Sequence, residues 1–222
     1  MFNIKAAISH LQQTENLIIC LRHGERYGAS SIAAGTEIEL TPAGKATSKT
    51  LGNYLNTKFT NGYGLKSSPI KRCVQTAEIL SDCCQQIQPE VILSQTLGAP
   101  GPYISNTDTA AKIFAQKSIF EIVQMQCQHL PIPGFHATSV GTEFMCQKIL
   151  ADLTETTRPA LYISHDVILA AFIGSLVEGL HLDQNNWPGY LEGFCIFRQQ
   201  EDLYLQTART CTRIKTSYKA HN

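Results

Sequence analysis

A short polar cluster, Arg22-His23-Gly24-Glu25-Arg26, contains the residue types that phosphate chemistry requires. It directly follows an aliphatic run, residues 17–21, of the kind found in strands that are buried on both faces of a parallel sheet. Arginine binds phosphate oxygens through a planar fork of N–H donors, and a neutral imidazole can attack phosphorus and carry the phosphoryl group. Gly24 permits a sharp turn and the close approach of a ligand. The cluster therefore indicates an anion site beside a nucleophile, although Arg-His-Gly alone also occurs by chance.

Two further polar clusters occupy the same kind of position. Ser67-Ser68-Pro69-Ile70-Lys71-Arg72 follows a short predicted strand and begins a helix, and Ser164-His165-Asp166 follows a second aliphatic run. Because the carboxyl ends of parallel strands meet at one edge of a sheet, we expect the three clusters to lie together. They supply two histidines, three arginines and an acid. This set suffices for phosphoryl transfer through a covalent histidine intermediate, and we expect no metal and no other cofactor.

Strands and helices must alternate along the chain to position these clusters. Strands are predicted at residues 17–21, 63–66, 91–93 and 160–164, followed by a hairpin at 193–198 and 202–207. Helices are predicted at residues 2–13, 41–57, 67–80, 108–128, 139–153 and 167–180. This order predicts a three-layer α/β/α sandwich with a mainly parallel central sheet. We expect one domain over residues 1–222, with a helical extension at 1–14 and a peripheral tail at 209–222.

The composition argues against several classes of partner. The chain has 18 Lys and Arg and 18 Asp and Glu residues, so no global basic field favours nucleic acid or a membrane surface. We find no apolar run that approaches the ~18 residues of a membrane-spanning helix, and no signal peptide. The eight scattered cysteines are typical of buried thiols in a reducing, cytoplasmic compartment, although their even number leaves secretion open.

Taken in order, the three clusters resemble the motifs of the histidine phosphatase superfamily, also called phosphoglycerate-mutase-like. The resemblance rests on Arg22-His23-Gly24, on the Ser-Ser-Pro-x-x-Arg-x-x-Gln-Thr-Ala pattern at residues 67–77, and on the late His165. It covers roughly residues 17–197. It implies the α/β fold of that family and the metal-independent hydrolysis of phosphomonoesters.

The resemblance also implies a role for each site residue. His23 would be the nucleophile that forms phosphohistidine, and His165 would be the second histidine of the pocket. Arg22, Arg26 and Arg72 would hold the phosphoryl oxygens. Nearby positive charge should lower the pKa of His23 and so keep its imidazole neutral for attack.

The proton donor is harder to identify. The pair His165-Asp166 resembles the His-Asp pair of the acid-phosphatase branch, in which the aspartate protonates the leaving group, and Arg26 also favours that branch. Gly28 stands where that branch usually has a proline, and the chain length resembles that of the mutase-like branch. The latter takes its acid from a mid-chain glutamate, for which residues 96–109 offer no obvious equivalent. If Asp166 is the acid, poor leaving groups should react best at mildly acidic pH; alternatively, it is only the N-cap of the next helix.

Other residues have open roles. Glu25 could orient a neighbour or reach substrate. Glu192 lies in a segment, residues 187–193, that resembles small bacterial members of the family; its Trp187 and Glu192 either pack near the site or belong to a turn. His136 could line the mouth of the pocket or lie in a surface loop.

The substrate is not identified by the sequence. The segments expected to roof the pocket, residues 27–40 and 99–107, carry few charges, which disfavours highly phosphorylated substrates. A small phosphomonoester or a phosphorylated protein side chain is the expected partner, and the oligomeric state is unknown. A phosphomutase of the same fold and a non-catalytic phosphate-binding regulator stay as alternatives, although binding alone requires no nucleophile.

Overall fold

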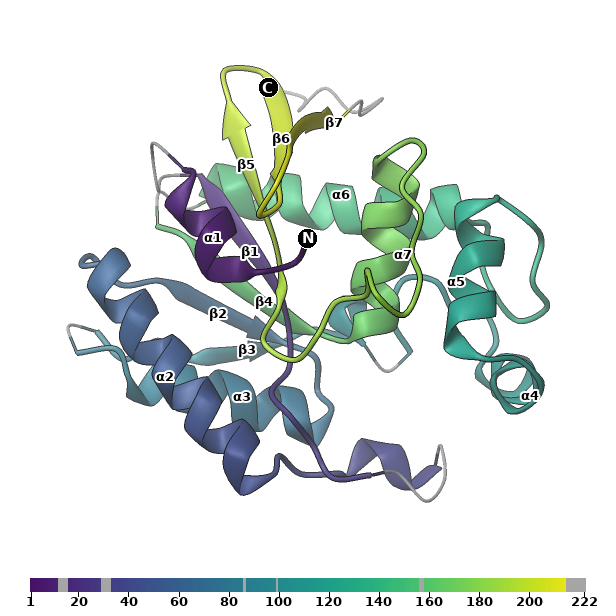
Figure 1. Ribbon diagram of the computed structural model, residues 1–222, viewed down its shortest axis with the longest axis horizontal. Coiled ribbons are helices and arrows are strands. Elements are labelled where there is room, and N and C mark those ends of the chain that lie inside the picture. Colours follow the sequence, from purple (N-terminus) through teal and green to yellow (C-terminus); the bar gives the residue numbers. More distant parts are fainter. Residues whose placement is uncertain (12–15, 29–32, 86, 99, 156–157, 215–222) are drawn as a thin grey trace.

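The computed structural model describes residues 1–11, 16–28, 33–85, 87–98, 100–155 and 158–214 (Figure 1). The elements follow in the order α1 (Ile4–Ser9), β1 (Leu17–Arg22), η1 (Ala33–Thr36), α2 (Pro42–Lys58), β2 (Gly64–Ser67), α3 (Lys71–Asp82), β3 (Val91–Leu93), η2 (Gln95–Leu97), α4 (Thr107–Gln116), α5 (Ile119–Cys127), α6 (Thr138–Glu155), β4 (Ala160–Ser164), α7 (Asp166–Leu176), β5 (Gly193–Gln199), β6 (Asp202–Gln206) and β7 (Cys211–Ile214), where η marks a short 3₁₀ helix. Within these ranges, no helix is long and apolar enough to cross a membrane.

The strands form one seven-stranded sheet in the order β3-β2-β4-β1-β5-β6-β7. The pairs β3–β2, β2–β4 and β4–β1 are parallel, whereas β1–β5, β5–β6 and β6–β7 are antiparallel. The sheet is therefore mixed rather than mainly parallel. The predicted hairpin of β5 and β6 is present, and its two strands are antiparallel because a tight turn can join only antiparallel strands. Strand β5 also runs antiparallel to β1, so the sheet is antiparallel from β1 to β7. Strand β7 lies in the predicted tail, of which residues 215–222 fall outside the described part.

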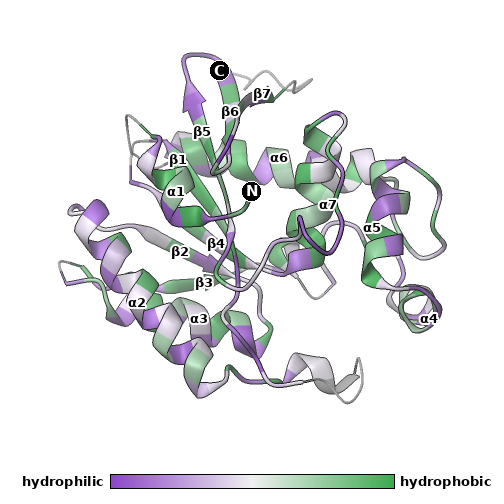
Figure 2. Cartoon of the chain, in the orientation of Figure 1, coloured by the Kyte–Doolittle hydropathy of each residue, from purple (hydrophilic) through white to green (hydrophobic). Residues whose placement is uncertain are grey.

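Helices cover both faces of the sheet, which confirms the three-layer α/β/α architecture (Figure 1). Alternate side chains of β1 point to opposite faces: Ile18 and Cys20 pack in the core formed with α5, α6 and α7, whereas Ile19 and Leu21 pack in the core formed with α1, α2 and α3. Strands β1 and β4 are correspondingly hydrophobic over most of their length (Figure 2). Buried on both faces, β1 holds the residues that follow it in a fixed position.

Gly193 permits the close pairing of β5 with β1. A Cβ atom at this position would lie 1.8 Å from the backbone oxygen of Cys20. Any side chain at residue 193 would therefore push β5 away from the strand that leads into His23.

Four predicted helices differ from the structure. The helix predicted at residues 67–80 begins only at Lys71, because Ser67 still belongs to β2, and the helix predicted at 167–180 ends at Leu176. The predicted helix at residues 108–128 is two helices, α4 and α5, because Ser118 and Glu121 form a capping box that begins a new helix. The predicted N-terminal helix over residues 2–13 is the shorter α1, and part of its predicted range lies outside the described residues. The predicted start of α2 is confirmed: the Thr41 side chain accepts a hydrogen bond from the Gly44 amide. The cysteines are free thiols and, except for the partly buried Cys127 and the exposed Cys211, they are buried.

Candidate active site

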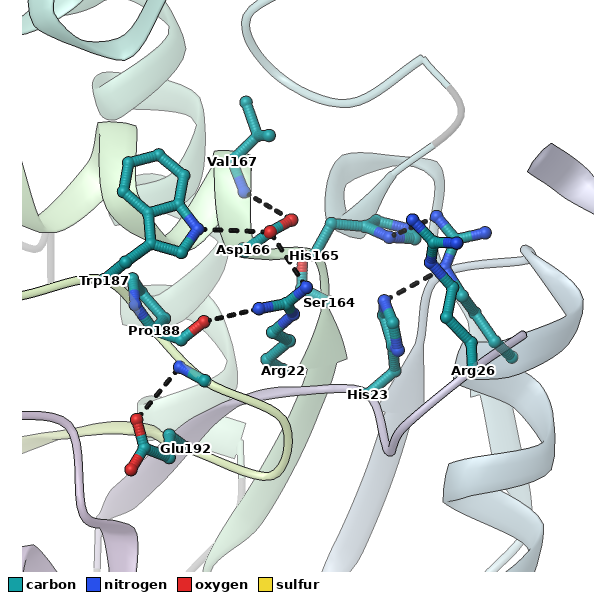
Figure 3. Close-up of polar contacts among 12 residues, drawn as sticks. Arg22, His23, Arg26, Ser164, His165, Asp166, Val167, Trp187, Pro188 and Glu192 are labelled. Carbon is teal, nitrogen blue, oxygen red and sulfur yellow. Dashed lines mark hydrogen bonds and ion pairs between the residues drawn. The ribbon is translucent and has the colours of Figure 1, made fainter. Parts of the chain in front are cut away.

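The structure brings the three polar clusters together at one edge of the sheet. Strands β2, β4 and β1 are neighbours, with Ser67 opposite Ile163 and Arg22 opposite Ser164 at their carboxyl ends. The residues that follow each strand therefore converge, and Figure 3 shows His23, His165 and Arg26 facing a common space. The order of the strands thus brings together residues as far apart in the sequence as Arg22 and Asp166, which are 144 positions apart.

His23 is buried, with 1% of its surface exposed. Its Nδ1 lies 2.7 Å from the backbone oxygen of Gly24, which can only accept a hydrogen bond, so Nδ1 carries the proton. The Nε2 atom therefore has a free lone pair, and it accepts a hydrogen bond from Arg72 Nε at 3.0 Å. Burial first, and then the nearby His165 and Arg72, hold the pKa of His23 well below its usual range. The imidazole is thus neutral and has its nucleophilic nitrogen on the side of the arginines.

His165 carries its proton on the opposite nitrogen. Its Nδ1 accepts a hydrogen bond from Arg72 Nη2 at 3.0 Å, so its Nε2 donates to Ser68 Oγ at 2.9 Å. Burial, followed by the charges of Arg72 and Arg22, lowers the pKa of His165 to about 3. The centroids of the two imidazole rings are 5.6 Å apart. One guanidinium group, that of Arg72, therefore joins both histidines.

Helix α3 organises the surrounding backbone. Arg72 also donates through Nη1 to the backbone oxygen of Gly35, the Gly24 amide donates to Thr76 Oγ1 at 3.0 Å, and the Leu40 amide donates to Gln75 Oε1 at 2.8 Å. These contacts hold the turn after β1 and the later part of the following loop, from Gly35 to Leu40, against one helix. The Ser-Ser-Pro-x-x-Arg-x-x-Gln-Thr-Ala pattern thus positions backbone as well as phosphate ligands.

A second network fixes Arg22. Its Nη1 donates to the Pro188 oxygen at 2.7 Å, and its Nη2 forms an ion pair with Asp166 Oδ2 at 3.0 Å. The same carboxylate oxygen accepts a hydrogen bond from Trp187 Nε1 at 3.1 Å (Figure 3). The Arg22 guanidinium also stacks on the Tyr190 ring, with its carbon 4.3 Å from the ring centroid. Arg22 is therefore held in one orientation beside His23.

Arg26 and Gly98 complete the surroundings of His165. Arg26 donates to the Tyr27 backbone oxygen at 2.8 Å and lies close enough to His165 and Arg72 to lower the pKa of each, although burial is the larger cause for both. Gly98 has a φ of +150°. A Cβ atom there would lie 2.6 Å from His165 Nε2, so only glycine allows this loop to pass beside the ring.

Several residues whose roles the sequence leaves undecided lie outside the polar site around His23. Glu25 has an exposed side chain, and Glu192 accepts a hydrogen bond from the Gly189 amide at 2.9 Å and points away from His23 (Figure 3). His136 is exposed in a separate hollow that Phe144 also lines. Asp166 is the first residue of α7, and the N-cap is His165. Asp166 is therefore not the N-cap itself, although its Oδ1 accepts a hydrogen bond from the Val167 amide at 3.0 Å, and its Oδ2 bonds to Arg22 and Trp187.

Sequence reasoning missed two members of this site. Ser68 belongs to the Ser-Ser-Pro motif, but its partner His165 is 97 residues away, and no local pattern indicates that the two side chains pair. Tyr190 lies 5.8 Å from the His23 ring, between centroids, and is 41% exposed, so it forms a wall between His23 and solvent. A single aromatic residue in a turn carries no signal for that role.

The two neutral histidines predict a decrease of stability in acid. In the unfolded chain a histidine titrates near pH 6.5, whereas in the folded protein the pKa of His165 is about 3. Between these values the unfolded chain binds more protons, so the free energy of unfolding should fall as the pH decreases through this window, by at most about 1.4 kcal/mol per pH unit for each histidine.

Chemical denaturation between about pH 7 and pH 5 measures this slope. His165→Asn removes one of the titrating groups and should make the dependence shallower. An identical slope in the variant and the wild type would show that His165 is not held neutral in the folded protein.

Comparisons with known proteins agree with this architecture. The model of the histidine phosphatase superfamily (branch 1) matches residues 18–97, a range that contains the first two clusters and ends before His165. No curated protein matches the sequence. The matched branch is not the acid-phosphatase branch that the pair His165-Asp166 suggested, and that pair lies beyond the matched range.

Solved structures share the fold. A histidine-to-alanine variant of phosphoserine phosphatase from Entamoeba histolytica, in complex with phosphoserine, is 16% identical and superposes with a TM-score of 0.59, covering 85% of this chain and 94% of that one. The same enzyme with 3-phosphoglyceric acid is 16% identical, with a TM-score of 0.58 and coverage of 90% and 98%. A mycobacterial glucosyl-3-phosphoglycerate phosphatase is 19% identical, with a TM-score of 0.50 and coverage of 81% and 88%. The resemblance to the histidine phosphatase superfamily, and its fold, are thereby confirmed.

Proposed function

We propose that this protein, whose sequence and fold match the histidine phosphatase superfamily, is a metal-independent phosphomonoester hydrolase that acts through a phosphohistidine at His23. The observation that carries the proposal is the state of His23: a buried, neutral imidazole whose Nε2 lone pair faces Arg72, with Arg22 and Arg26 close by. The phosphoserine and phosphoglycerate complexes of the Entamoeba enzyme are consistent with a small phosphorylated substrate.

In the first step, the substrate phosphate binds among Arg22, Arg26 and Arg72. The Arg72 Nε donor that now bonds to His23 turns to a phosphoryl oxygen, which frees the lone pair of His23, while the bond from Arg72 Nη2 to His165 stays in place. His23 Nε2 attacks phosphorus, an N–P bond forms, and the bond from phosphorus to the ester oxygen breaks. The Gly24 oxygen stabilises the positive charge that develops on the imidazole, because it accepts the Nδ1 proton. Catalysis is mainly electrostatic and positional.

In the second step, water attacks the phosphohistidine and the N–P bond breaks. His23 returns to its neutral form and inorganic phosphate leaves. His165 is kept neutral by its surroundings. Its Nε2–H donates a hydrogen bond to Ser68 Oγ, and its Nδ1 accepts a hydrogen bond from Arg72 and so orients that guanidinium. It therefore positions the guanidinium through both steps.

The experiment that tests this function is hydrolysis of p-nitrophenyl phosphate in excess EDTA, together with alkaline quenching of the enzyme during turnover. We expect chelation to leave the rate unchanged, and we expect a base-stable, acid-labile phosphoenzyme. Release of inorganic phosphate without an added alcohol distinguishes a hydrolase from a phosphomutase, which returns the phosphoryl group to its substrate. Absence of both turnover and phosphoenzyme would refute the proposal in favour of a binding protein.

Asp166 is the proposed proton donor to the leaving group. A cavity lies beside His165, and among the described residues that line it Asp166 is the only one with a carboxylate side chain. We expect Asp166→Asn to slow hydrolysis of an alkyl ester such as 2-glycerol phosphate by roughly 10²-fold or more, because an alkoxide leaves poorly without a proton. The p-nitrophenolate ion needs no proton to leave, so the loss with p-nitrophenyl phosphate should be smaller by about tenfold.

The two esters separate the two roles that Asp166 could have. If the carboxylate only holds Arg22, its removal weakens phosphate binding equally for both substrates. Equal losses of kcat/KM would therefore contradict the proposal of a proton donor. Trp187→Phe is the matched control, because it removes one hydrogen bond to Asp166 and keeps the carboxylate.

A further inference from the structure

A cavity of about 390 Å³ opens beside the phosphate-binding residues. Arg26, Arg72, His165 and Asp166 form its polar side. From there it extends between α3, α5 and α7, and its remaining wall is largely hydrophobic, formed mainly by Ile70, Tyr103, Phe114, Ile119, Phe135 and Ile168. Its size is within the range of roughly 300–1,000 Å³ that is typical of small-molecule sites.

The interior of this cavity suits an apolar group rather than a polar one. Beyond the arginines and Asp166, the residues found to line it include no charged side chain in the described parts of the chain. The Tyr103 hydroxyl is already paired with Thr142 Oγ1, at 3.2 Å. A sugar or amino-acid leaving group would bury hydroxyl, ammonium or carboxylate groups here without partners, which is unfavourable.

One polar side chain of the cavity wall, that of Gln126, has a buried atom without a hydrogen-bond partner. Gln126 is 2% exposed, and it lies on the same buried face of α5 as Ile122 and Val123. Its Oε1 atom has no hydrogen-bond partner among the described residues, although buried polar atoms are nearly always paired. The oxygen itself is buried, and a rotation of the Gln126 side chain would turn it into the cavity that the residue lines, where a ligand would supply the missing partner.

We propose that the substrate is a phosphomonoester of an apolar alcohol or phenol that carries a hydroxyl group at the end remote from the phosphate. The phosphate lies among the arginines, the hydrocarbon part fills the cavity, and the distal hydroxyl pairs with the Gln126 amide. This assignment rests on the proposed function for its chemistry. Its geometry is tested by binding alone.

Phosphonates test the cavity without catalysis, because their C–P bond is not hydrolysed. By calorimetry, the wild-type protein should bind 2-naphthylmethylphosphonate at least about tenfold more tightly than methylphosphonate, since each buried carbon group contributes to discrimination. Ile119→Trp fills the cavity and should abolish this preference. Equal affinities of the wild-type protein for the two phosphonates would overturn the proposal.

The role of Gln126 is tested with a hydroxylated ligand. The wild-type protein should bind (6-hydroxy-2-naphthyl)methylphosphonate roughly fivefold more tightly than the unsubstituted naphthyl compound, because the hydroxyl pairs with the amide. Gln126→Leu should abolish this difference, whereas Gln124→Leu, on the exposed face of the same helix, should retain it. A hydroxyl preference that is absent in the wild-type protein, or unchanged in Gln126→Leu, would overturn the assignment.

The proposed hydrolase activity and the proposed apolar substrate class can be refuted independently of each other. If p-nitrophenyl phosphate is hydrolysed but the phosphonates bind equally, the hydrolase stands and the apolar substrate class is wrong. If the naphthyl phosphonate is preferred but no ester is hydrolysed, the cavity is a ligand site and the proposed hydrolase is wrong.

Discussion

His23→Ala is expected to lower kcat for phosphomonoester hydrolysis by on the order of 10⁴-fold or more, and to abolish the phosphoenzyme. The reason is that no other nucleophile can replace Nε2 in its position: it is buried, its proton is fixed on Nδ1 by the Gly24 oxygen, and it lies next to the phosphate ligand Arg72. His165 cannot substitute, because its accepting nitrogen is bonded to Arg72. Stopped assays with p-nitrophenyl phosphate and trapping of the phosphoenzyme by an alkaline quench measure the two effects.

The control must separate loss of chemistry from loss of structure. His23→Ala keeps all three arginines, so inorganic phosphate should still raise its Tm, which shows an intact anion site. His136→Ala provides a matched substitution of an exposed histidine and should change kcat less than about twofold. Substantial activity in His23→Ala would exclude a phosphohistidine at this position. A large loss in His136→Ala would place His136 at the mouth of the pocket.

The parts of the fold that follow from hydrophobic pattern could be predicted from the sequence. The aliphatic runs of β1 and β4 can be stable only in the middle of a sheet, and the polar residues after them must then lie at its carboxyl edge. The convergence of His23, Arg72 and His165 therefore follows from the hydrophobic pattern alone. The same pattern also predicted the hairpin of β5 and β6, but not that this hairpin makes half of the sheet antiparallel.

The remaining features depend on contacts that local patterns do not encode. Ser68 and His165 pair across the sheet, and the Arg72 guanidinium reaches the backbone of Gly35 in a loop that precedes it by 37 residues. The orientation of Glu192 away from the site depends on its own turn. By contrast, the capping box at Ser118 was readable in the sequence, as Ser-x-x-Glu before an apolar run, and it marks the division between α4 and α5.

The unpaired amide oxygen of Gln126 shows how the sequence pattern and the three-dimensional contacts together indicate a ligand site. Helical spacing from Ile122 and Val123 places a polar residue on a buried face, which is visible in the sequence. Only the structure shows that the amide oxygen lacks a hydrogen-bond partner and that Gln126 lines a cavity beside the phosphate-binding residues. A polar residue on a buried helical face is therefore a useful signal for a ligand site once the fold is known.

Arg72→Ala is expected to lower kcat/KM by roughly 10³-fold, because Arg72 joins both histidines and binds the phosphoryl group. Arg72→Lys should recover at most about tenfold of this loss, since one ammonium group cannot donate in parallel to His23 Nε2 and His165 Nδ1. Lys71→Ala, which removes the neighbouring, exposed partner of Glu39, is the matched control and should change kcat/KM less than about threefold.

The pH dependence of Arg72→Lys and Arg72→Ala distinguishes charge from geometry. Burial is the larger cause of the lowered pKa of His23, and the positive charge of Arg72 adds to it. Removing the charge in Arg72→Ala should therefore raise the pKa of His23 toward its ordinary value, so that protonation inactivates the nucleophile at a higher pH. Arg72→Lys keeps the charge and should keep the acidic limb of the wild-type profile despite its lower rate. If the acidic limb of Arg72→Ala coincides with that of the wild type, Arg72 acts only as a geometric clamp on the phosphoryl group and does not tune the nucleophile.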